Sequence, residues 1–107
     1  MPQEDEAARM FKILSSGTRL RMIGLLKDRA LCVNALARDL GITPAAVSQH
    51  LRVLRDSALV IGQKRGNFVH YTINQKRLLE WNETAAGFLG VGDKMVLPTI
   101  QGGDATD

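Results

Sequence analysis

The sequence lacks the features that define several large classes of protein. Among its 107 residues there is one cysteine, Cys32, so no disulfide framework can form within the chain, and this fits a reducing cytosol. No apolar run approaches the roughly 18 residues that a membrane-spanning helix needs. The acidic start, MPQEDE, is unlike the basic start of a secretory signal. We therefore expect a cytoplasmic protein with no membrane partner.

Catalytic motifs are also missing. There is no glycine-rich phosphate loop, no paired acid motif and no nucleophile with a base at a recognisable spacing. Cys32 could pair with His50 or His70 as nucleophile and base, but their spacing in the sequence matches no known motif of that kind. We expect no enzyme, no catalytic residue and no cofactor.

The positive charge of the chain is concentrated in its middle third. The formal net charge is only +3, but residues 50–77 carry six basic side chains and one acidic side chain. Residues 78–107 carry one basic and five acidic side chains. A basic segment of this kind is typical of a site for a polyanion, although it also fits a solvated basic face.

The spacing of apolar residues predicts a mainly α-helical domain over residues 1–90. Helical periodicity extends over residues 4–14, 18–28, 34–40 and about 75–89, while the apolar run 30–33 is too short to classify. Residues 91–107, rich in glycine and small polar side chains, are expected to form a flexible tail.

The clearest helix begins at Thr43. Thr43 is a good N-cap, and Pro44 suits the first helical position. One buried stripe is predicted, formed by Val47, Leu51, Leu54 and Ala58. With the preceding short helix and the turn at residues 41–43, this helix forms a predicted helix-turn-helix.

A β-hairpin follows this helix-turn-helix. Residues 59–73 change to alternating spacing, and Gly66-Asn67 is a plausible hairpin turn with Lys64 and Arg65 at its tip. The fold prediction is therefore a winged helix-turn-helix, mainly α with a small β-hairpin, whose terminal helices form a dimer interface.

A helix fits the major groove of DNA, and a cationic hairpin can contact the backbone or the minor groove. We predict that Ala45, Ser48 and Gln49 face base edges. Thr43, Arg52 and Arg55 are predicted to hold phosphates. Lys64, Arg65 and Asn67 of the hairpin are further predicted DNA contacts, on the backbone or in the minor groove. His50 is either a DNA contact or a hydrogen-bonded boundary residue, and His70 is expected to be exposed.

The segment from Cys32 to Val60, CVNALARDLGITPAAVSQHLRVLRDSALV, resembles the ArsR/SmtB family of bacterial winged-helix repressors. The family pattern of serine, a variable residue and His-Leu is matched at residues 48–51, and its wing glycine and tyrosine at Gly66 and Tyr71. The family usually has Ala-Gly-Leu-Val after the recognition helix, and here Ala58 replaces that glycine. The resemblance covers roughly residues 8–90.

This resemblance implies a homodimeric repressor that binds an inverted-repeat operator on double-stranded DNA and is released by an inducer. An alternative is a winged-helix module that contacts protein or RNA without binding an operator. Salt-dependent retention on duplex DNA distinguishes the two, since a protein-binding module would lack it.

The identity of the inducer depends on Cys32. It occupies the first position of the family's Cys-Val-Cys metal motif, but Asn34 replaces the second cysteine, and a soft-metal site needs several thiolates. Cys32 is therefore a small buried residue, a redox-sensing thiol at a helix start that favours the thiolate, or a minor contributor to a metal site. On the last helix Glu80 and Glu83 lack a histidine, so no family-type metal site is expected there. An oxidant or a small molecule is the expected inducer.

The terminal helices are apolar on more than one face and need a cover. A second chain would supply it, through an interface of Met10, Phe11, Leu14, Leu78, Trp81, Ala85 and Phe88. A small-ligand pocket between subunits is the alternative interpretation of the same residues.

Overall fold

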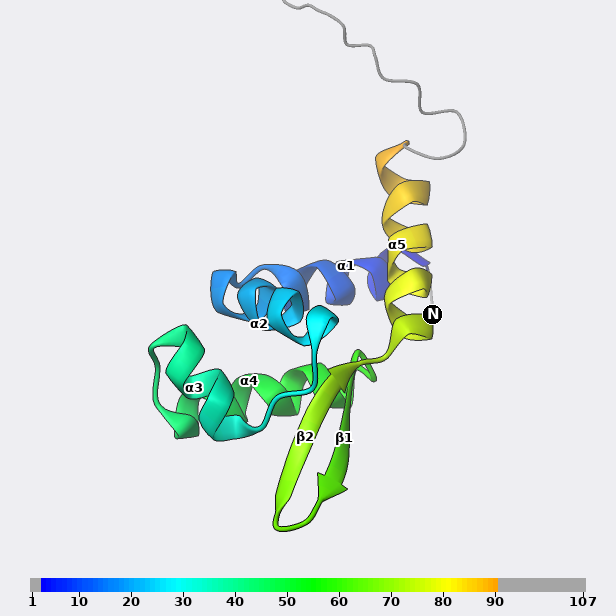
Figure 1. Ribbon diagram of the computed structural model, residues 1–107. Coiled ribbons are helices and arrows are strands. Elements are labelled where there is room, and N and C mark those ends of the chain that lie inside the picture. Colours follow the sequence, from blue (N-terminus) through cyan, green and yellow to red (C-terminus); the bar gives the residue numbers. More distant parts are fainter. Residues whose placement is uncertain (1–2, 91–107) are drawn as a thin grey trace, which may run out of the picture.

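The computed structural model describes residues 3–90, which form five helices and one two-stranded hairpin (Figure 1). Their order is α1 Gln3–Leu14, α2 Gly17–Asp28, α3 Val33–Leu40, α4 Pro44–Asp56, β1 Val60–Arg65, β2 Phe68–Ile73 and α5 Gln75–Leu89. The predicted winged helix-turn-helix is confirmed, and the tail predicted to be flexible lies outside the described residues. Among the described elements, no helix combines the length and apolar character that crossing a bilayer requires.

Side chains just before three helices cap their free backbone N–H groups. Ser16 Oγ accepts from Arg19 N at 3.2 Å, and Asn74 Oδ1 accepts from Arg77 N at 3.3 Å. Thr43 Oγ1 accepts from Ala46 N at 3.1 Å, so the predicted N-cap of α4 is confirmed. Each cap satisfies a donor that has no partner within its own helix, which fixes where the helix begins.

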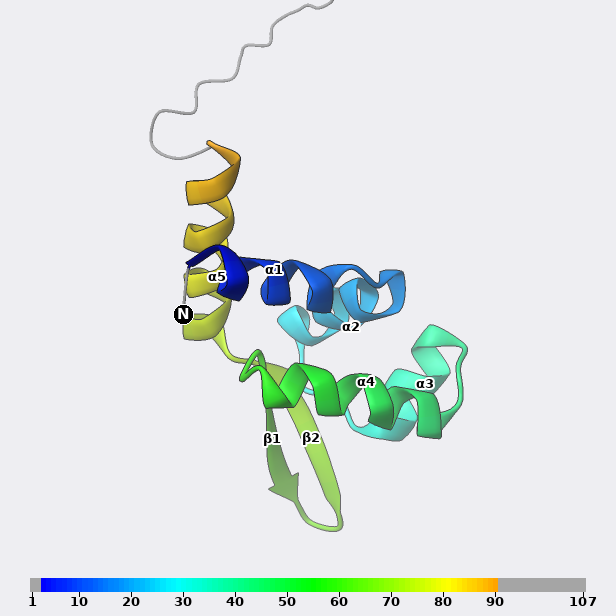
Figure 2. The same ribbon diagram turned by 180° about the vertical axis from the view of Figure 1, so that it is seen from behind.

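The helices form two layers that share one core. Helices α1 and α2 lie together above α3 and α4, and the hairpin descends beside α4 (Figures 1 and 2). Fully buried side chains from α2, α3, α4 and the segment after α4 meet between the layers: Met22, Leu36, Val47, Leu54 and Leu59. This core sets the position of α4 relative to the hairpin.

The hairpin is attached to the helices by a short backbone bridge. Tyr71 N donates to Leu31 O at 2.8 Å, and Leu31 N donates to Tyr71 O at 3.1 Å. The run 30–33, which periodicity left unclassified, therefore supplies one residue of strand to the edge of the wing. Gly62 in β1 lets the Tyr71 ring lie against the strand, since a Cβ there would come within 2.9 Å of that ring.

The prediction that Ala58 belongs to the buried stripe of α4 is wrong. The helix ends at Asp56, and Ala58 is exposed with a left-handed φ of 65°. Ala58 N donates to Arg55 O at 2.9 Å, and Leu59 N donates to Leu54 O at 3.0 Å. This pair of bonds is a Schellman ending, which reverses the chain and buries Leu59 against the end of the stripe in place of Ala58.

Helix α5 stands across α1 and extends beyond the rest of the domain (Figure 2). Its first half is anchored by Trp81, which is buried in the common core. Beyond this anchor, Phe88 and Leu89 are exposed.

Candidate nucleic-acid interface

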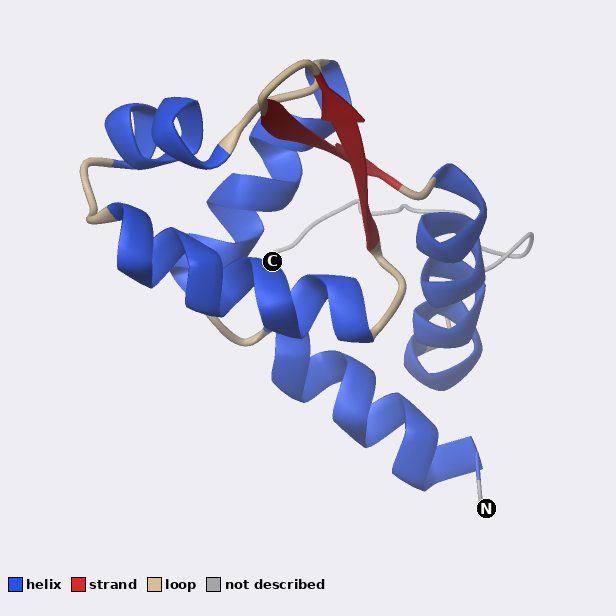
Figure 3. Ribbon diagram, turned by 90° about the horizontal axis from the view of Figure 1, so that it is seen from below, coloured by secondary structure: helices blue, strands red, loops and turns tan. Residues whose placement is uncertain are grey.

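Helix α4 buries one side and exposes the other. Val47, Leu51 and Leu54 face the core and are at most 3% exposed. On the open side lie the predicted contact residues Ala45, Ser48, Gln49, Arg52 and Arg55. Seen from below, α4 and the hairpin lie on the near side of the molecule (Figure 3). One surface therefore presents the polar side of a helix beside a β-hairpin, the arrangement that major-groove readers use.

Thr43 has two roles at the start of this surface. Its Oγ1 already accepts the capping bond from Ala46 N, but its hydroxyl hydrogen is still free to be donated. The side chain is exposed. Thr43 can therefore cap α4 and donate to a phosphate oxygen at the same time.

The cations of this surface are exposed and carry uncompensated charge. Within residues 3–90, the ion pairs involve Arg29, Arg38 and Arg77. None involves Arg52 or Arg55 of α4 or the two cations of the wing tip. Their charge is thus available to a polyanion.

The wing separates its two cations onto opposite faces. In the antiparallel register Lys64 pairs with Val69 and Arg65 pairs with Phe68. Side chains alternate between the two faces of a strand. Lys64 therefore lies on the same face of the hairpin as the buried Tyr71, and Arg65 lies on the opposite face. Gly66 and Asn67 form the turn as predicted. The sequence predicted both cations at the tip, and the strand places them on its opposite faces.

His50 turns toward the inside of the domain. Its Nδ1 lies 3.2 Å from a guanidinium nitrogen of Arg19 in α2, and the residue is half-buried. Burial lowers the pKa of His50 from its ordinary value, and the Arg19 charge lowers it further. Of the two interpretations of His50, this geometry favours the hydrogen-bonded boundary residue.

His70 is half-buried, so the expectation of a simply exposed side chain is wrong. It pairs across the hairpin with Gln63, and its Nδ1 is buried without a hydrogen-bond partner. The strand pattern placed its face correctly but could not give its burial.

The residues predicted for a dimer interface divide into three groups. Met10 and Trp81 are buried in the core of their own chain. Leu14, Leu78 and Ala85 are half-buried against it. Phe11 and Phe88 are exposed, and α5 exposes two further leucines that the prediction did not include, Leu79 and Leu89. Helices α1 and α5 therefore do expose apolar side chains, but Trp81 is buried in the core and is not part of that exposed surface.

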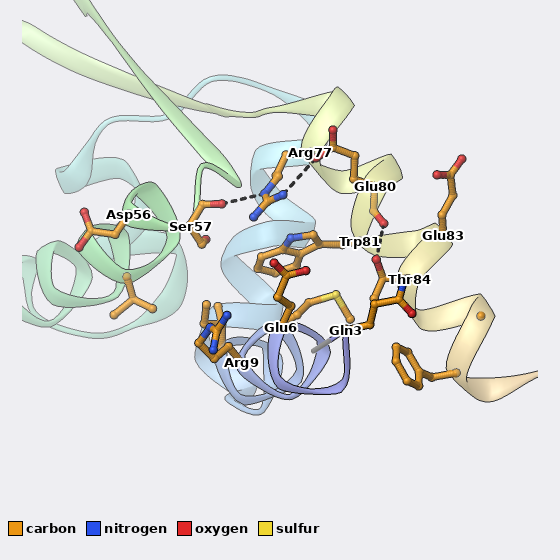
Figure 4. A pocket seen from close by; sticks show the side chains of 15 residues that line it. Gln3, Glu6, Arg9, Asp56, Ser57, Arg77, Glu80, Trp81, Glu83 and Thr84 are labelled. Carbon is orange, nitrogen blue, oxygen red and sulfur yellow. Dashed lines mark hydrogen bonds and ion pairs between the residues drawn. The ribbon is translucent and has the colours of Figure 1, made fainter. Parts of the chain in front are cut away.

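A pocket of about 860 Å³ lies between α1, the end of α4 and α5 (Figure 4). Trp81 is part of its lining, which also includes the charged residues Glu6, Arg9, Asp56, Arg77, Glu80 and Glu83. It therefore mixes an aromatic surface with charges of both signs. Unlike the predicted pocket between subunits, it lies within one chain.

Arg77 joins this pocket to the end of α4. Its Nε donates to Ser57 O at 3.0 Å, and another nitrogen donates to Glu80 Oε1 at 3.1 Å. Its guanidinium carbon lies 5.6 Å from the centre of the Trp81 ring, within cation–π range. Nearby, Asn74 Nδ2 donates to Ala58 O at 2.9 Å. Sequence reasoning missed this junction because its partners lie 16 to 20 residues apart.

Cys32 is the N-cap residue of α3 and is half-buried. Its side chain makes no capping hydrogen bond. Within residues 3–90, no three His, Cys, Asp or Glu side chains lie together as metal ligands. The described residues therefore give Cys32 no cluster of metal ligands. A packed thiol and a redox-sensing thiol are the two interpretations of Cys32 that fit this geometry.

Comparisons with known proteins converge on one family. Residues 16–61 match the model for bacterial regulatory proteins of the arsR family. The chain is 30% identical to a transcriptional repressor SmtB homolog from Synechocystis sp., over 87% of this chain and 70% of that protein. It is 26% identical to the transcriptional repressor SdpR from Bacillus subtilis, over 78% of this chain and 93% of that protein.

The fold agrees with this match. The crystal structure of Rv0081 from M. tuberculosis superposes with a TM-score of 0.69 at 31% identity, covering 84% of this chain and 91% of that one. The matched segment, residues 16–61, contains α2, α3 and α4 and so includes the exposed side of α4, while the tip of the hairpin lies beyond it.

Proposed function

Since this chain belongs to the arsR family of bacterial regulatory proteins, whose members are DNA-binding transcriptional regulators and not enzymes, we propose that it is a homodimeric repressor. In this proposal it binds an inverted-repeat operator and is released by an inducer. The observation that carries the proposal is the exposed polar side of α4 beside the hairpin, whose cations have no ion-pair partner within residues 3–90.

Base readout is assigned to the first turns of α4. Ala45, Ser48 and Gln49 face base edges, and a glutamine can pair bidentately with adenine, worth about 1–3 kcal/mol of discrimination. Thr43, Arg52 and Arg55 hold phosphates, and Asn67 with the two wing cations adds backbone contacts. Phosphate contacts fix the register, and base contacts supply the sequence preference.

Selection from random DNA duplexes tests this division. Gln49→Ala should relax the preference at one position in each half-site, because alanine cannot hydrogen-bond to a base edge. Arg52→Ala should weaken binding to all duplexes alike. If Arg52→Ala altered the base preference and Gln49→Ala left it unchanged, the assignment would be reversed.

Dimerisation is assigned to the exposed apolar surface of α1 and α5. Phe11, Leu79 and Phe88 are between 38% and 61% exposed, and a second chain would remove them from water. To read an inverted repeat, such a dimer would need its two α4 helices about 34 Å apart, one turn of DNA. Leu79→Glu should shift the protein toward monomer in sedimentation equilibrium. Leu20→Glu, on the exposed side of α2, is the matched control and should leave the dimer intact.

The proposed inducer is an oxidant that reacts with Cys32 or a small molecule bound near the terminal helices. A thiolate metal site of the family type is disfavoured, because Asn34 replaces the second cysteine and borrowing the partner's thiol would give two sulfurs per dimer. A screen of metals, oxidants and organic ligands for loss of operator binding identifies the chemical class of the inducer.

A further inference from the structure

Arg19, in the first turn of α2, hydrogen-bonds to both neighbouring helices. Its Nε donates to Ile13 O at 2.6 Å, and one of its terminal nitrogens lies 3.2 Å from His50 Nδ1. Ile13 is the second-last residue of α1, where carbonyl groups have no partner within their own helix. One side chain therefore ties the end of α1 to the middle of α4.

This bridge requires the guanidinium group. A guanidinium carries five N–H donors in a rigid plane, so it can serve two acceptors that lie in different directions. A lysine ammonium is a compact charge on a flexible stem and does not reproduce that geometry. The bridge also requires a particular state of its partner, since His50 Nδ1 can accept only while it carries no proton.

We propose that Arg19 is a positioning residue that holds α4 in its DNA-reading orientation, and that it does so only while His50 is neutral, so that acidification weakens operator binding. The inference rests on the proposed function, because it assigns a means of control to the same surface. It also links α1, part of the proposed dimer interface, to the reading helix through one side chain.

Within residues 3–90, the charge that acts on the pKa of His50 is that of Arg19, and it disfavours the protonated form. Arg19 faces the ring from α2, and a protonated ring would set an N–H and a positive charge against it. Other basic groups on these three helices, Lys12, Arg21 and Arg52 among them, are exposed. Within residues 3–90, no carboxylate forms an ion pair with His50 or Arg19.

The test measures binding to the selected operator and to a scrambled duplex from pH 7.5 to pH 5.5. We expect the wild-type preference for the operator to fall severalfold, with most of the loss at the acid end of this range, because burial and Arg19 hold the pKa of His50 below its ordinary value. His50→Asn places an amide oxygen where Nδ1 accepted and cannot titrate, so its preference should stay constant. His70→Asn, the matched control, should follow the wild-type profile. The opposite sign is the sharpest refutation: a His50 that contacted phosphate would bind DNA more tightly as the pH falls.

A second pair of variants keeps the test independent of acid. At pH 7.5 Arg19→Gln should lower the operator preference about tenfold, as if the ring were protonated, while leaving scrambled-duplex binding unchanged. Arg19→Lys should not restore it. Restoration by lysine, or loss of thermal stability alone with normal binding, would overturn the positioning role. Absence of any preferred duplex for the wild type at pH 7.5 would instead contradict the proposed function.

Discussion

Replacing Ala58 with glycine should stabilise the protein. Ala58 adopts a φ of 65° in the Schellman ending of α4, and its N–H and C=O are both engaged there. The left-handed conformation costs a non-glycine residue about 1–2 kcal/mol. Glycine removes that cost but gives the unfolded chain more freedom, worth about 0.5–1 kcal/mol. The net expectation for Ala58→Gly is a gain of about 0.5–1 kcal/mol in the free energy of unfolding.

Urea denaturation at a fixed protein concentration measures this gain, because a dimer's apparent stability depends on concentration. The midpoint should rise while the slope stays unchanged, which marks a change of stability and not of the unfolded state's compactness. In thermal unfolding a gain of this size corresponds to about 2–8 °C for a domain of this length.

Ala8→Gly is the matched control. Ala8 is also exposed, but it lies within α1, where glycine costs about 0.5–1 kcal/mol relative to alanine. The same chemical change should therefore have opposite signs at the two positions. If Ala58→Gly lowered the midpoint as Ala8→Gly does, the left-handed conformation assigned to Ala58 would be contradicted.

Three further predictions concern the wing, the core and the inducer. Replacing Lys64 and Arg65 together by alanine should reduce the salt dependence of DNA binding by about 0.9 for each phosphate that the wing no longer neutralises, and an unchanged slope would place the wing away from DNA. Trp81→Ala should lower the free energy of unfolding by about 3–5 kcal/mol, because the buried indole supports α5 within its own chain; a stable variant that merely dissociates would contradict this. Operator binding should survive stoichiometric zinc or arsenite, and release that is abolished by Cys32→Ser would disprove that expectation.

Local signals predicted most of the fold. Thr43-Pro44 fixed the start of α4 because an N-cap and a proline at the first position act within a few residues. The alternation across residues 68–73 and the Gly66-Asn67 turn likewise placed the hairpin. The end of α4 was misjudged because Ala58 fits the apolar period, while the chain reversal depends on backbone bonds that the period does not reveal.

Long-range contacts could not be predicted. Arg19 and His50 lie 31 residues apart, and nothing in either segment indicates that they meet. Trp81 has the spacing of an interface residue, but whether an apolar side chain faces its own core or a second chain depends on how α5 crosses α1. The exposed residues of α4 were predictable because the apolar spacing within that one helix separates its buried side from its open side.

If two copies of this chain read an inverted repeat with their α4 helices, both helices should shield the major groove of the selected duplex. Methylation protection of guanine N7 detects this shielding, because that atom lies in the major groove. We expect two protected clusters related by a dyad and separated by about one helical turn, roughly 10–10.5 base pairs. A single protected cluster, or guanine N7 atoms that stay fully reactive throughout the duplex, would show that the two helices do not read the repeat.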